Sequence, residues 1–384
     1  MEYKKIGELT SVVTGGTPKT SHPEYWENGE IPWLQSGCCQ NCDVYSSEKY
    51  ITKEGYDNSS TRLMPADTVM IALTGATAGK IGYLRFEACG NQSITGIFPC
   101  NSLNQRYLFY FLISQRERIL SDCIGGAQPH ISQGYVKDIK IPIPTMEEQQ
   151  SIVKRLETTR QLIDQRQNEI KLLDQLIKAR FVEMFGDPIN NDKGWKTASV
   201  ESLCTEIYGG GTPSKAHPEY YKDGDIPWVS SKDMKCEVIK DSQIKINQLG
   251  VENSTARMVP VNSVIIVIRS GILKHTLPVA INAVPITINQ DLKAFIPNEL
   301  VLAKFLSVQF KMHEKDILSG VRAVTADNIE FNSLKQREMI VPPIELQQQY
   351  DVFLSQVDKS RFVVQKALDE AQLLFDSLMQ EYFG

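Results

Sequence analysis

The sequence predicts an α+β fold in which two α/β globular domains are separated by two long helices that pair as an antiparallel coiled coil, with an internal pseudo-twofold repeat. Motifs of the first half recur in order in the second half, and each half ends in a long segment with helical periodicity. The length of 384 residues also exceeds the usual size of one domain. We expect globular domains at 1–144 and 187–342, with helices at 145–186 and 343–384.

The repeat consists of short motifs at a nearly constant offset. The letters GGTP, HPEY and IPW follow one another from Gly15 and again from Gly210, an offset of 195 residues (210 minus 15). Further along, an offset of 198 (289 minus 91) relates the Asn-Gln pair at Asn91 to the pair at Asn289. The same offset relates the Phe-Gly pairs that end both long segments. Because the register persists through the whole chain, we infer two copies of one module.

Each globular part is predicted to mix strands and helices. The runs Val69–Leu73 and Val264–Ile268 are rich in aliphatic and β-branched residues and bounded by polar or glycine-containing segments, which indicates buried strands. The segments 103–120 and 299–318 have the character of short helices. Clusters of Gly and Pro between these segments indicate turns.

The tail of each copy is predicted to be a long amphipathic helix. Residues 146–184 contain no Gly or Pro, and their apolar residues recur in steps of three, four or seven, as do those of 345–383. Two such stripes in one chain are best buried against each other. A helix of this length is a rod of roughly 58 Å at 1.5 Å per residue. The residues Gly186-Asp187-Pro188 are expected to end the first helix and to begin the connection to the second copy.

An antiparallel helix pair predicts a spacer that holds two similar surfaces at a fixed separation. Double-stranded DNA presents its readable groove once per helical turn of about 34 Å, so DNA is the target that this geometry favours. The net charge of −5 does not itself indicate a nucleic-acid-binding protein. However, residues 345–384 contain seven acidic and three basic side chains, so this helix accounts for most of the negative charge.

Composition indicates an ordinary globular protein, with 42% hydrophobic and 23% charged residues. Apolar runs such as Val264–Ile268 are far shorter than the roughly 20 residues of a membrane span. The first residues, MEYKKIGEL, have no apolar signal-peptide core. Eight cysteines in a chain of this length suggest reduced thiols, and we therefore expect a cytoplasmic protein without membrane contact.

The order of these elements resembles the specificity subunit of type I restriction-modification systems, and the resemblance covers essentially the whole chain. It rests on the two GGTP…IPW openings, the letters TGATAGK from Thr74, the helix starts PTMEEQ and PPIELQ, and the Phe-Gly helix ends. The second copy departs from the first at the TGATAGK loop, where it has RSGILKHT from Arg269.

The resemblance implies a subunit that recognises DNA without catalysing a reaction. Two target-recognition domains would each read one half of an asymmetric, split DNA site, and the paired helices would set the gap. Expected partners are double-stranded DNA, two methylation subunits and two restriction subunits. This chain would need no cofactor of its own. S-adenosylmethionine for methylation of adenine N6, and ATP with Mg²⁺ for translocation and cleavage, would belong to the partner subunits.

Catalytic and cofactor motifs do not fit the sequence. The loop from Gly75 resembles a phosphate-binding loop, but it has one residue too few between its glycines and Ile81 where Ser or Thr would bind Mg²⁺. No Asn-Pro-Pro-Tyr or Asp-Pro-Pro-Tyr motif of an adenine methyltransferase is present. One CxxC lies between Cys39 and Cys42, without a second pair at zinc-finger spacing or a counterpart in the second copy. We therefore expect no catalytic residues and no metal site.

Comparison of the copies separates framework from specificity. Domains that read different half-sites should agree where they share scaffold and differ where they contact bases. The matched histidines His22 and His217 are therefore predicted to belong to the framework, with contact to the DNA backbone phosphates as the alternative. The matched arginines Arg62 and Arg257 are expected to form ion pairs or phosphate contacts. Candidate base readers are polar residues that differ between equivalent loops, because Arg or Lys suits guanine, Gln suits adenine and Thr suits the thymine methyl group. These candidates are Ser36, Thr77, Lys80, Gln128 and His130 in the first copy, and Lys232, Arg269, Lys274, His275, Arg322 and Thr325 in the second.

Two other classes of function compete with DNA recognition. A scaffold without DNA affinity could recruit partners through its helices and bind protein through its globular parts. Salt-dependent preference for one DNA sequence would separate this reading from a DNA-recognition subunit. A self-sufficient methyltransferase or nuclease is disfavoured by the missing motifs.

Overall fold

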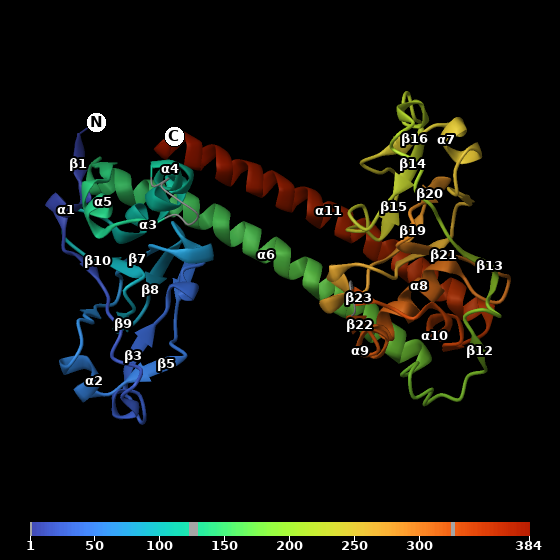
Figure 1. The fold of residues 1–384 in the computed structure, drawn as a ribbon, viewed down its shortest axis with the longest axis horizontal. Coiled ribbons are helices and arrows are strands. Elements are labelled where there is room, and N and C mark those ends of the chain that lie inside the picture. The colour runs from blue at the N-terminus through green and yellow to red at the C-terminus, as the bar shows by residue number, and fades with distance from the viewer. Residues whose placement is uncertain (1, 123–129, 324–326) are drawn as a thin grey trace. The chain divides into compact units, whose positions relative to one another are not determined.

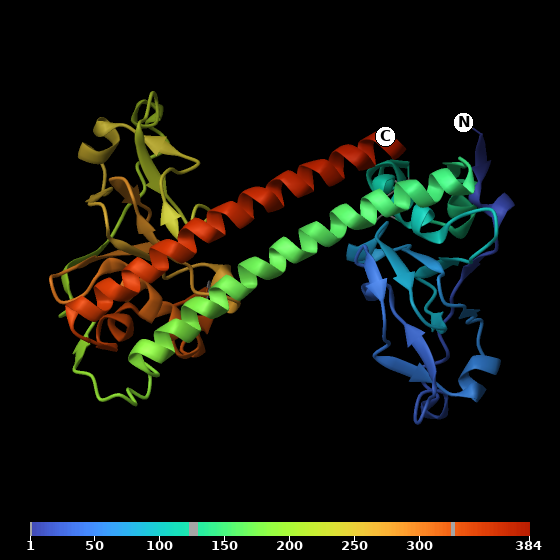
Figure 2. The same ribbon diagram turned by 180° about the vertical axis from the view of Figure 1, so that it is seen from behind.

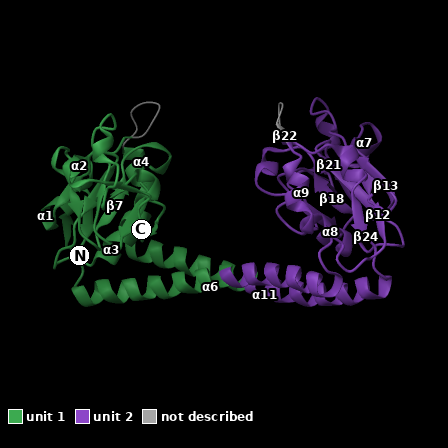
Figure 3. Ribbon diagram, turned by 90° about the horizontal axis from the view of Figure 1, so that it is seen from below, with its two compact units in different colours: residues 1–167, 365–384 green, residues 168–364 purple. Residues whose placement is uncertain are grey.

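The computed structural model describes residues 2–122, 130–323 and 327–384, which form two compact units. Unit 1 contains Met1–Gln167 and Gln365–Gly384, and unit 2 contains Asn168–Val364 (Figure 3). Each unit is a mixed α/β domain that includes part of both long helices (Figure 1). The expected α+β fold is confirmed. The boundary between the two units falls within both long helices. A unit is therefore not simply one globular domain together with the helix that follows it in the sequence.

Unit 1 is built on two sheets and a short two-stranded ladder. The five-stranded sheet has the order β2-β10-β7-β8-β4, the four-stranded sheet has the order β5-β3-β9-β6, and β1 pairs with β11. The pairs β4–β8 and β3–β9 are parallel, and the other pairs are antiparallel. The strands are β1 (Tyr3–Lys5), β2 (Val12–Thr14), β3 (Ile31–Leu34), β4 (Cys42–Val44), β5 (Lys49–Ile51), β6 (Leu63–Met64), β7 (Val69–Ala72), β8 (Ile81–Leu84), β9 (Ala88–Gly90), β10 (Ile94–Ile97) and β11 (Lys140–Pro142).

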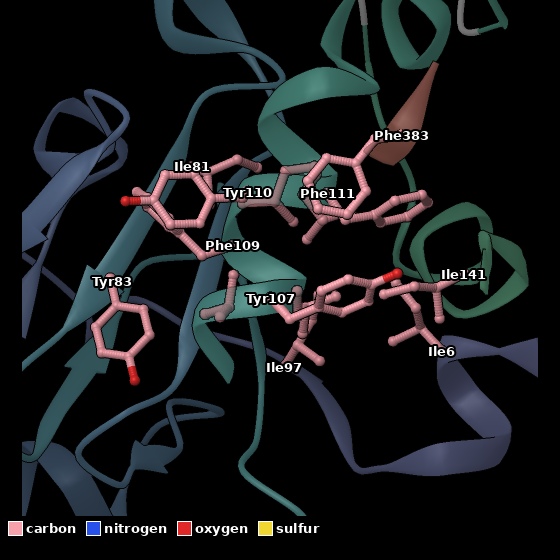
Figure 4. Packing of buried hydrophobic residues seen from close by; sticks show 14 of the residues in the cluster. Ile6, Ile81, Tyr83, Ile97, Tyr107, Phe109, Tyr110, Phe111, Ile141 and Phe383 are labelled. Atoms are coloured by element: carbon pink, nitrogen blue, oxygen red, sulfur yellow. The ribbon is translucent and has the colours of Figure 1, made fainter. Parts of the chain in front are cut away.

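The central strand β7 is buried on both faces, which explains why its sequence is continuously apolar. Val69 and Ile71 belong to the core beneath α3 (Gln105–Ser114), and Met70 and Ala72 belong to a second cluster on the other face. Figure 4 shows the first of these cores, in which aromatic side chains of α3 meet Phe383 from the far end of the chain. The other short helices are α1 (Ile6–Leu9), α2 (Lys53–Asp57), α4 (Arg116–Asp122) and α5 (Gln133–Asp138).

Unit 2 repeats this topology. Its five-stranded sheet has the order β13-β21-β18-β19-β15, its four-stranded sheet has the order β16-β14-β20-β17, and β12 pairs with β24. It adds a hairpin of β22 and β23. The strands are β12 (Thr197–Ser199), β13 (Cys204–Gly209), β14 (Ile226–Val229), β15 (Val238–Ile239), β16 (Lys245–Ile246), β17 (Met258–Val259), β18 (Val264–Val267), β19 (Val279–Asn282), β20 (Ile286–Ile288), β21 (Leu292–Pro297), β22 (Arg322–Ala323), β23 (Asp327–Asn328) and β24 (Glu338–Ile340). The helices are α7 (Gln248–Glu252), α8 (Ala303–Met312), α9 (Glu314–Ser319) and α10 (Phe331–Lys335).

The two predicted long helices are α6 (Met146–Phe185) and α11 (Ile344–Phe383). Within unit 2 they run antiparallel: Asp174 contacts Arg361 at 2.6 Å, and the carbonyl oxygen of Ile177 accepts a 2.9 Å hydrogen bond from the Tyr350 hydroxyl (Figure 2). Within unit 1, the end of α11 contacts the start of α6 through Arg155 and the Tyr382 hydroxyl. The expected antiparallel pairing is therefore confirmed. As predicted, α6 ends before Gly186, whose φ of 76° is in the left-handed region that favours glycine.

One buried glutamine attaches the start of each long helix to its domain. Gln149 donates to the carbonyl of Pro144 at 3.0 Å and accepts from the backbone N–H of Asn104 at 2.8 Å. Gln347 makes the matching bonds to Pro342 and Leu302 at 2.9 and 3.0 Å. These matched contacts fix the helix start against the loop that precedes α3 or α8, so the duplication extends to individual hydrogen bonds.

Candidate functional site

The matched opening motifs form an internal framework. The indole N–H of Trp33 donates to the carbonyl of Gly16 at 2.9 Å, and Trp228 donates to Gly211 at the same distance. A Cβ atom at Gly15 would lie 2.1 Å from the carbonyl oxygen of Gly90, so only glycine fits this crossing of two segments. The residues that the two copies share in this motif therefore make their contacts within each unit.

The matched histidines and arginines also have internal partners. His22 contacts Glu24 at 2.7 Å, and His217 contacts Glu219 at 2.9 Å. Each histidine also stacks on the tyrosine three residues later. Arg257 forms an ion pair with an acidic side chain at 2.6 Å, which agrees with the ion-pair expectation for this position. The Arg62 guanidinium instead donates to the carbonyl of the preceding residue at 2.9 Å.

In unit 1, the candidates Thr77 and Lys80 lie on the loop between β7 and β8. The only helix in this loop, which is described throughout, is the short 3-10 helix Gly75–Thr77, and β8 follows it. A phosphate-binding loop leads into an α-helix, so this loop is not the phosphate-binding loop that its sequence resembles. The Lys80 ammonium donates to the Gln40 side chain at 2.6 Å. Ser36, on the same 35–41 loop as Gln40, is half-buried at the start of another 3-10 helix. The structure thus brings two candidate loops together.

The third candidate loop of unit 1 is described only at its end. His130 is exposed, and the next backbone N–H, that of Ile131, donates to the carbonyl of Leu73 at 2.9 Å. His130 therefore lies next to the start of the β7–β8 loop. Gln128 lies outside the described residues.

In unit 2, the loop between β18 and β19 carries three candidates. It spans 11 residues, from 268 to 278, whereas the equivalent loop of unit 1 spans 8, from 73 to 80, which places the change of offset here. Arg269 is paired with Asp291 at 2.6 Å. The exposed Lys274 approaches the buried Asp327 at 3.9 Å, and His275 is exposed.

The β22–β23 hairpin lies against this loop. Asn328 is the register partner of Arg322 in the hairpin, and it forms an isolated bridge with Arg269. The structure therefore places Arg269, Lys274 and the backbone of Arg322 around one short strand. Lys232 is exposed on a separate loop before β15, and Thr325 lies outside the described residues.

The partners of the candidate side chains could not be predicted from the differences between the two copies. Gln40, Asp291 and Asp327 each hold a candidate cation but lie between about 22 and 53 residues from it along the chain. Asp291 does carry a signal that the comparison could have used, because the copies differ at this position directly after a matched Asn-Gln pair.

Among the residues that the structure describes, no group of three metal-binding side chains is arranged to hold an ion. The described cysteines near the CxxC, Cys38, Cys39 and Cys42, are free thiols. A hydrogen bond with Cys39 lowers the pKa of Cys38, and the same bond, followed by burial, raises the pKa of Cys39. The described part of the chain also contains no helix long and apolar enough to cross a membrane.

The candidate loops can therefore present hydrogen-bond donors and cations to a ligand. Their exposed groups are the side chains of His130, Lys232, Arg269, Lys274 and His275. Donors and cations of this kind bind phosphates and the acceptor atoms on base edges. The two units carry different sets of these groups on one shared framework.

The family model described as "Type I restriction modification DNA specificity domain" matches residues 1–172 and 192–371. A type I restriction enzyme specificity subunit (MjaIX) of Methanocaldococcus jannaschii is 25% identical over 98% of this chain and 91% of its own length. The EcoR124I/EcoR124II specificity subunit of Escherichia coli is 28% identical over 93% of this chain and 87% of its own.

Solved structures show the same fold. A type I restriction-modification S subunit from M. genitalium superposes with a TM-score of 0.60 at 14% identity, covering all of this chain and 96% of that one. A chain from a study of complex assembly in a type I restriction-modification system gives a TM-score of 0.57 at 16% identity, covering all of this chain and 97% of that one.

Proposed function

Because this chain belongs to the type I restriction-modification DNA specificity family, we propose that it is the DNA sequence-specificity subunit of such a complex. It recognises a bipartite, asymmetric DNA site through its two globular domains and scaffolds the methylation and restriction subunits. The observation that carries this proposal is the duplicated framework with different polar side chains on equivalent loops.

The pattern of agreement and difference supports recognition of two half-sites. The buried parts of the repeat, such as Trp33 and Trp228, make the same hydrogen bond in both units. The loops that follow β7 and β18 differ both in length and in charge. A pair of modules that bound the same ligand would have no need for this difference. Two modules that read different bases need it.

The long helices support a scaffolding role. Several large apolar side chains on them are exposed, and a helix face of this kind is a candidate protein interface. In unit 2 these include Leu172 at 52%, Phe362 at 72% and Val363 at 66% exposure. We assign these exposed side chains to contacts with the methylation subunits, two of which would flank one specificity subunit. Two restriction subunits would complete the restriction complex.

The chemistry of the complex is assigned to the partners. The methylation subunits would bind S-adenosylmethionine and methylate adenine N6, and the restriction subunits would use ATP and Mg²⁺. This chain would supply recognition and positioning. Its own sequence lacks the Asn-Pro-Pro-Tyr or Asp-Pro-Pro-Tyr motif with which an adenine methyltransferase holds the target base.

The proposal predicts that the purified chain alone transfers no methyl group, and that methylation appears only with its methylation subunit and S-adenosylmethionine. Methylome sequencing of cells with and without the gene should reveal one split, asymmetric motif that depends on it. The matched control is a complex reconstituted without this chain, which should leave DNA unmodified.

Two outcomes would contradict the proposal. Methylation by the isolated chain at a rate near that of the complex would show that it is an enzyme. Binding that does not distinguish DNA sequences, measured over a range of salt concentrations, would favour a protein scaffold instead.

A further inference from the structure

The end of β7 and the end of β18 lie at equivalent places in the two units. The backbone N–H of Leu73 donates to the carbonyl of Ser93 at 2.8 Å, and that of Ile268 donates to the backbone carbonyl of Asp291 at 2.9 Å. Leu73 and Ile268 are related by the offset of 195, and Ser93 and Asp291 by the offset of 198. These matched backbone hydrogen bonds make Leu73 equivalent to Ile268, and Ser93 equivalent to Asp291.

The turn before Ser93 or Asp291 is also the same in both units. The side chain of Asn91 accepts a 3.1 Å hydrogen bond from the backbone N–H of Ser93. Asn289 accepts from the backbone N–H of Asp291 at the same distance, and Asn289 is buried. This turn, in which an asparagine bonds the backbone two residues later, fixes where the next side chain begins.

On this shared backbone, the side-chain pair changes its chemistry completely. In unit 1 the hydroxyl of Thr74 donates to the hydroxyl of Ser93 at 2.9 Å. In unit 2 the equivalent pair is Arg269 with Asp291, an ion pair at 2.6 Å. Both members of the contact differ together, while the hydrogen bonds around them are retained. That is the pattern expected of a position that sets specificity.

The geometry of the ion pair leaves one edge of the Arg269 guanidinium available. Asp291 Oδ1 accepts from Nε at 2.7 Å and from Nη2 at 2.6 Å. A guanidinium has five N–H groups, so both N–H groups of Nη1 and one of Nη2 stay unused by this carboxylate. Within the described part of the chain, the guanidinium has no second side chain as a hydrogen-bond or ion-pair partner. The side chain of Arg269 is 51% exposed, against 23% for Asp291, so the carboxylate lies on the protein side.

The Asp291 carboxylate is itself held in place. Its second oxygen accepts a 3.2 Å hydrogen bond from the side-chain amide of Asn289. The chain of contacts therefore runs from a buried framework amide through a half-buried carboxylate to an exposed guanidinium. A rigidly supported arginine loses less conformational entropy on binding than a free one.

We infer that Arg269 reads a guanine in the half-site of unit 2, and that Asp291 is the positioning residue that aims its Nη1–Nη2 edge at guanine O6 and N7. This inference rests on the proposed function and adds the base and the residue that reads it. Two parallel N–H groups from one arginine match the two acceptors that guanine presents in the major groove. Thr74 and Ser93 occupy the equivalent positions for the other half-site.

The test is an exchange of the two pairs in the full chain, within its methyltransferase complex. The variant Arg269→Thr with Asp291→Ser should lose the requirement for guanine at one position of the second half-site, with the first half-site unchanged. The reciprocal variant Thr74→Arg with Ser93→Asp should gain a guanine requirement in the first half-site. Both are read by methylome sequencing.

Binding to a panel of duplexes, each with one base pair substituted, supplies a measurement that does not need methylation. The wild-type complex should discriminate against loss of the contacted guanine by roughly ten- to a hundredfold, and the exchanged variant by less than about twofold. Asp291→Asn, which removes the charge but retains the shape, should reduce this ratio more than it reduces affinity for non-specific DNA. A purely structural role would weaken binding to all duplexes equally.

The matched control exchanges another ion pair of the same unit, Lys245 with Asp241, which are 3.1 Å apart and exposed. Lys245→Thr with Asp241→Ser should leave the motif unchanged. If the exchanged Arg269 variant binds and methylates with the same base requirement as wild type, the inference is wrong. If the wild-type complex shows no bipartite motif at all, the proposed function fails instead.

Discussion

At the scale of single residues, the two copies show how one backbone site tolerates different chemistry. His313 occupies the position that Gln115 has in the first copy, an offset of 198. Gln115 donates to the carbonyl of Phe383 at 3.0 Å. His313 is buried, and its Nδ1 lies 3.3 Å from a guanidinium nitrogen of Arg337. Nδ1 therefore accepts a hydrogen bond, which requires the neutral ring.

Burial, followed by the charge of Arg337, lowers the pKa of His313 below its ordinary value. The unfolded chain therefore binds a proton at this residue before the folded chain does, and stability is lost as pH falls below the unfolded pKa of about 6.5. We expect the free energy of unfolding to decrease between about pH 7 and pH 5, with a contribution from this group of at most about 1.4 kcal/mol per pH unit. Urea denaturation at several pH values measures it.

The variant His313→Gln places the residue of the first copy at this site and should flatten that pH dependence. His217→Gln, at an exposed histidine, is the control and should retain it. An identical slope in wild type and His313→Gln would show that the acid sensitivity arises elsewhere.

Part of the candidate site could be predicted from the sequence, and part could not. The candidates Arg269 and Lys274 were identified because they differ from the first copy, and the structure brings their loop against the β22–β23 hairpin. Their partners Asp291 and Asp327 were not identified, because ion pairing between distant residues depends on sheet topology. Periodicity and repeats carry no information on that topology.

At the scale of elements, the strong periodic signals were reliable. The helices predicted at 146–184 and 345–383 are α6 and α11, with boundaries shifted by one residue at most. The segment 103–120 is divided into α3 and α4, because α3 ends at Ser114 with Gln115 as its C-cap and α4 begins at Arg116. Short paired strands such as β6 and β17 have two residues each, and two residues cannot display a period.

The role of the two long helices as a spacer between the half-sites can be tested by lengthening them. Seven residues inserted after Gln167 in α6 and after Val364 in α11 preserve the apolar seam and add about 10 Å to each helix. We expect the gap between the half-sites to lengthen by about three base pairs, at 3.4 Å per base pair, with the same bases read. Methylome sequencing measures both.

An insertion of five residues at the same places is the matched control. Five residues rotate the following part of the helix by about 140° relative to the seam, so pairing and methylation should be lost. A folded, active seven-residue variant with an unchanged gap would refute the spacer role.

At the scale of the whole molecule, each unit is completed by a helix segment from the other repeat. Unit 1 contains residues 365–384, and these correspond to 167–186 of the first copy. The aromatic contacts that Phe383 makes with α3 in unit 1 resemble those that Phe185 makes with Phe305 of α8 in unit 2. A second copy of residues 167–186 could therefore replace 365–384.

We accordingly expect residues 1–186, expressed alone, to form a symmetric homodimer in which α6 pairs with a second α6. With methylation subunits, this dimer should methylate a palindromic split site made of the first half-site and its reverse complement. Light scattering measures the assembly, and mapping of methylation sites measures the motif. A stable, folded monomer, or a dimer that retains the asymmetric motif, would contradict the expectation.

The same exchange of helix segments has a consequence for biosynthesis. A ribosome releases the chain from its N-terminus, and domains generally fold as their residues emerge. Unit 2 is contiguous and is fully present once Val364 has emerged, whereas the core of unit 1 waits for Phe375, Met379 and Phe383 at the far end. The unit that is translated first is therefore completed last, and the aromatic side chains of α3 that contact Phe375 and Phe383 stay uncovered until those two residues emerge.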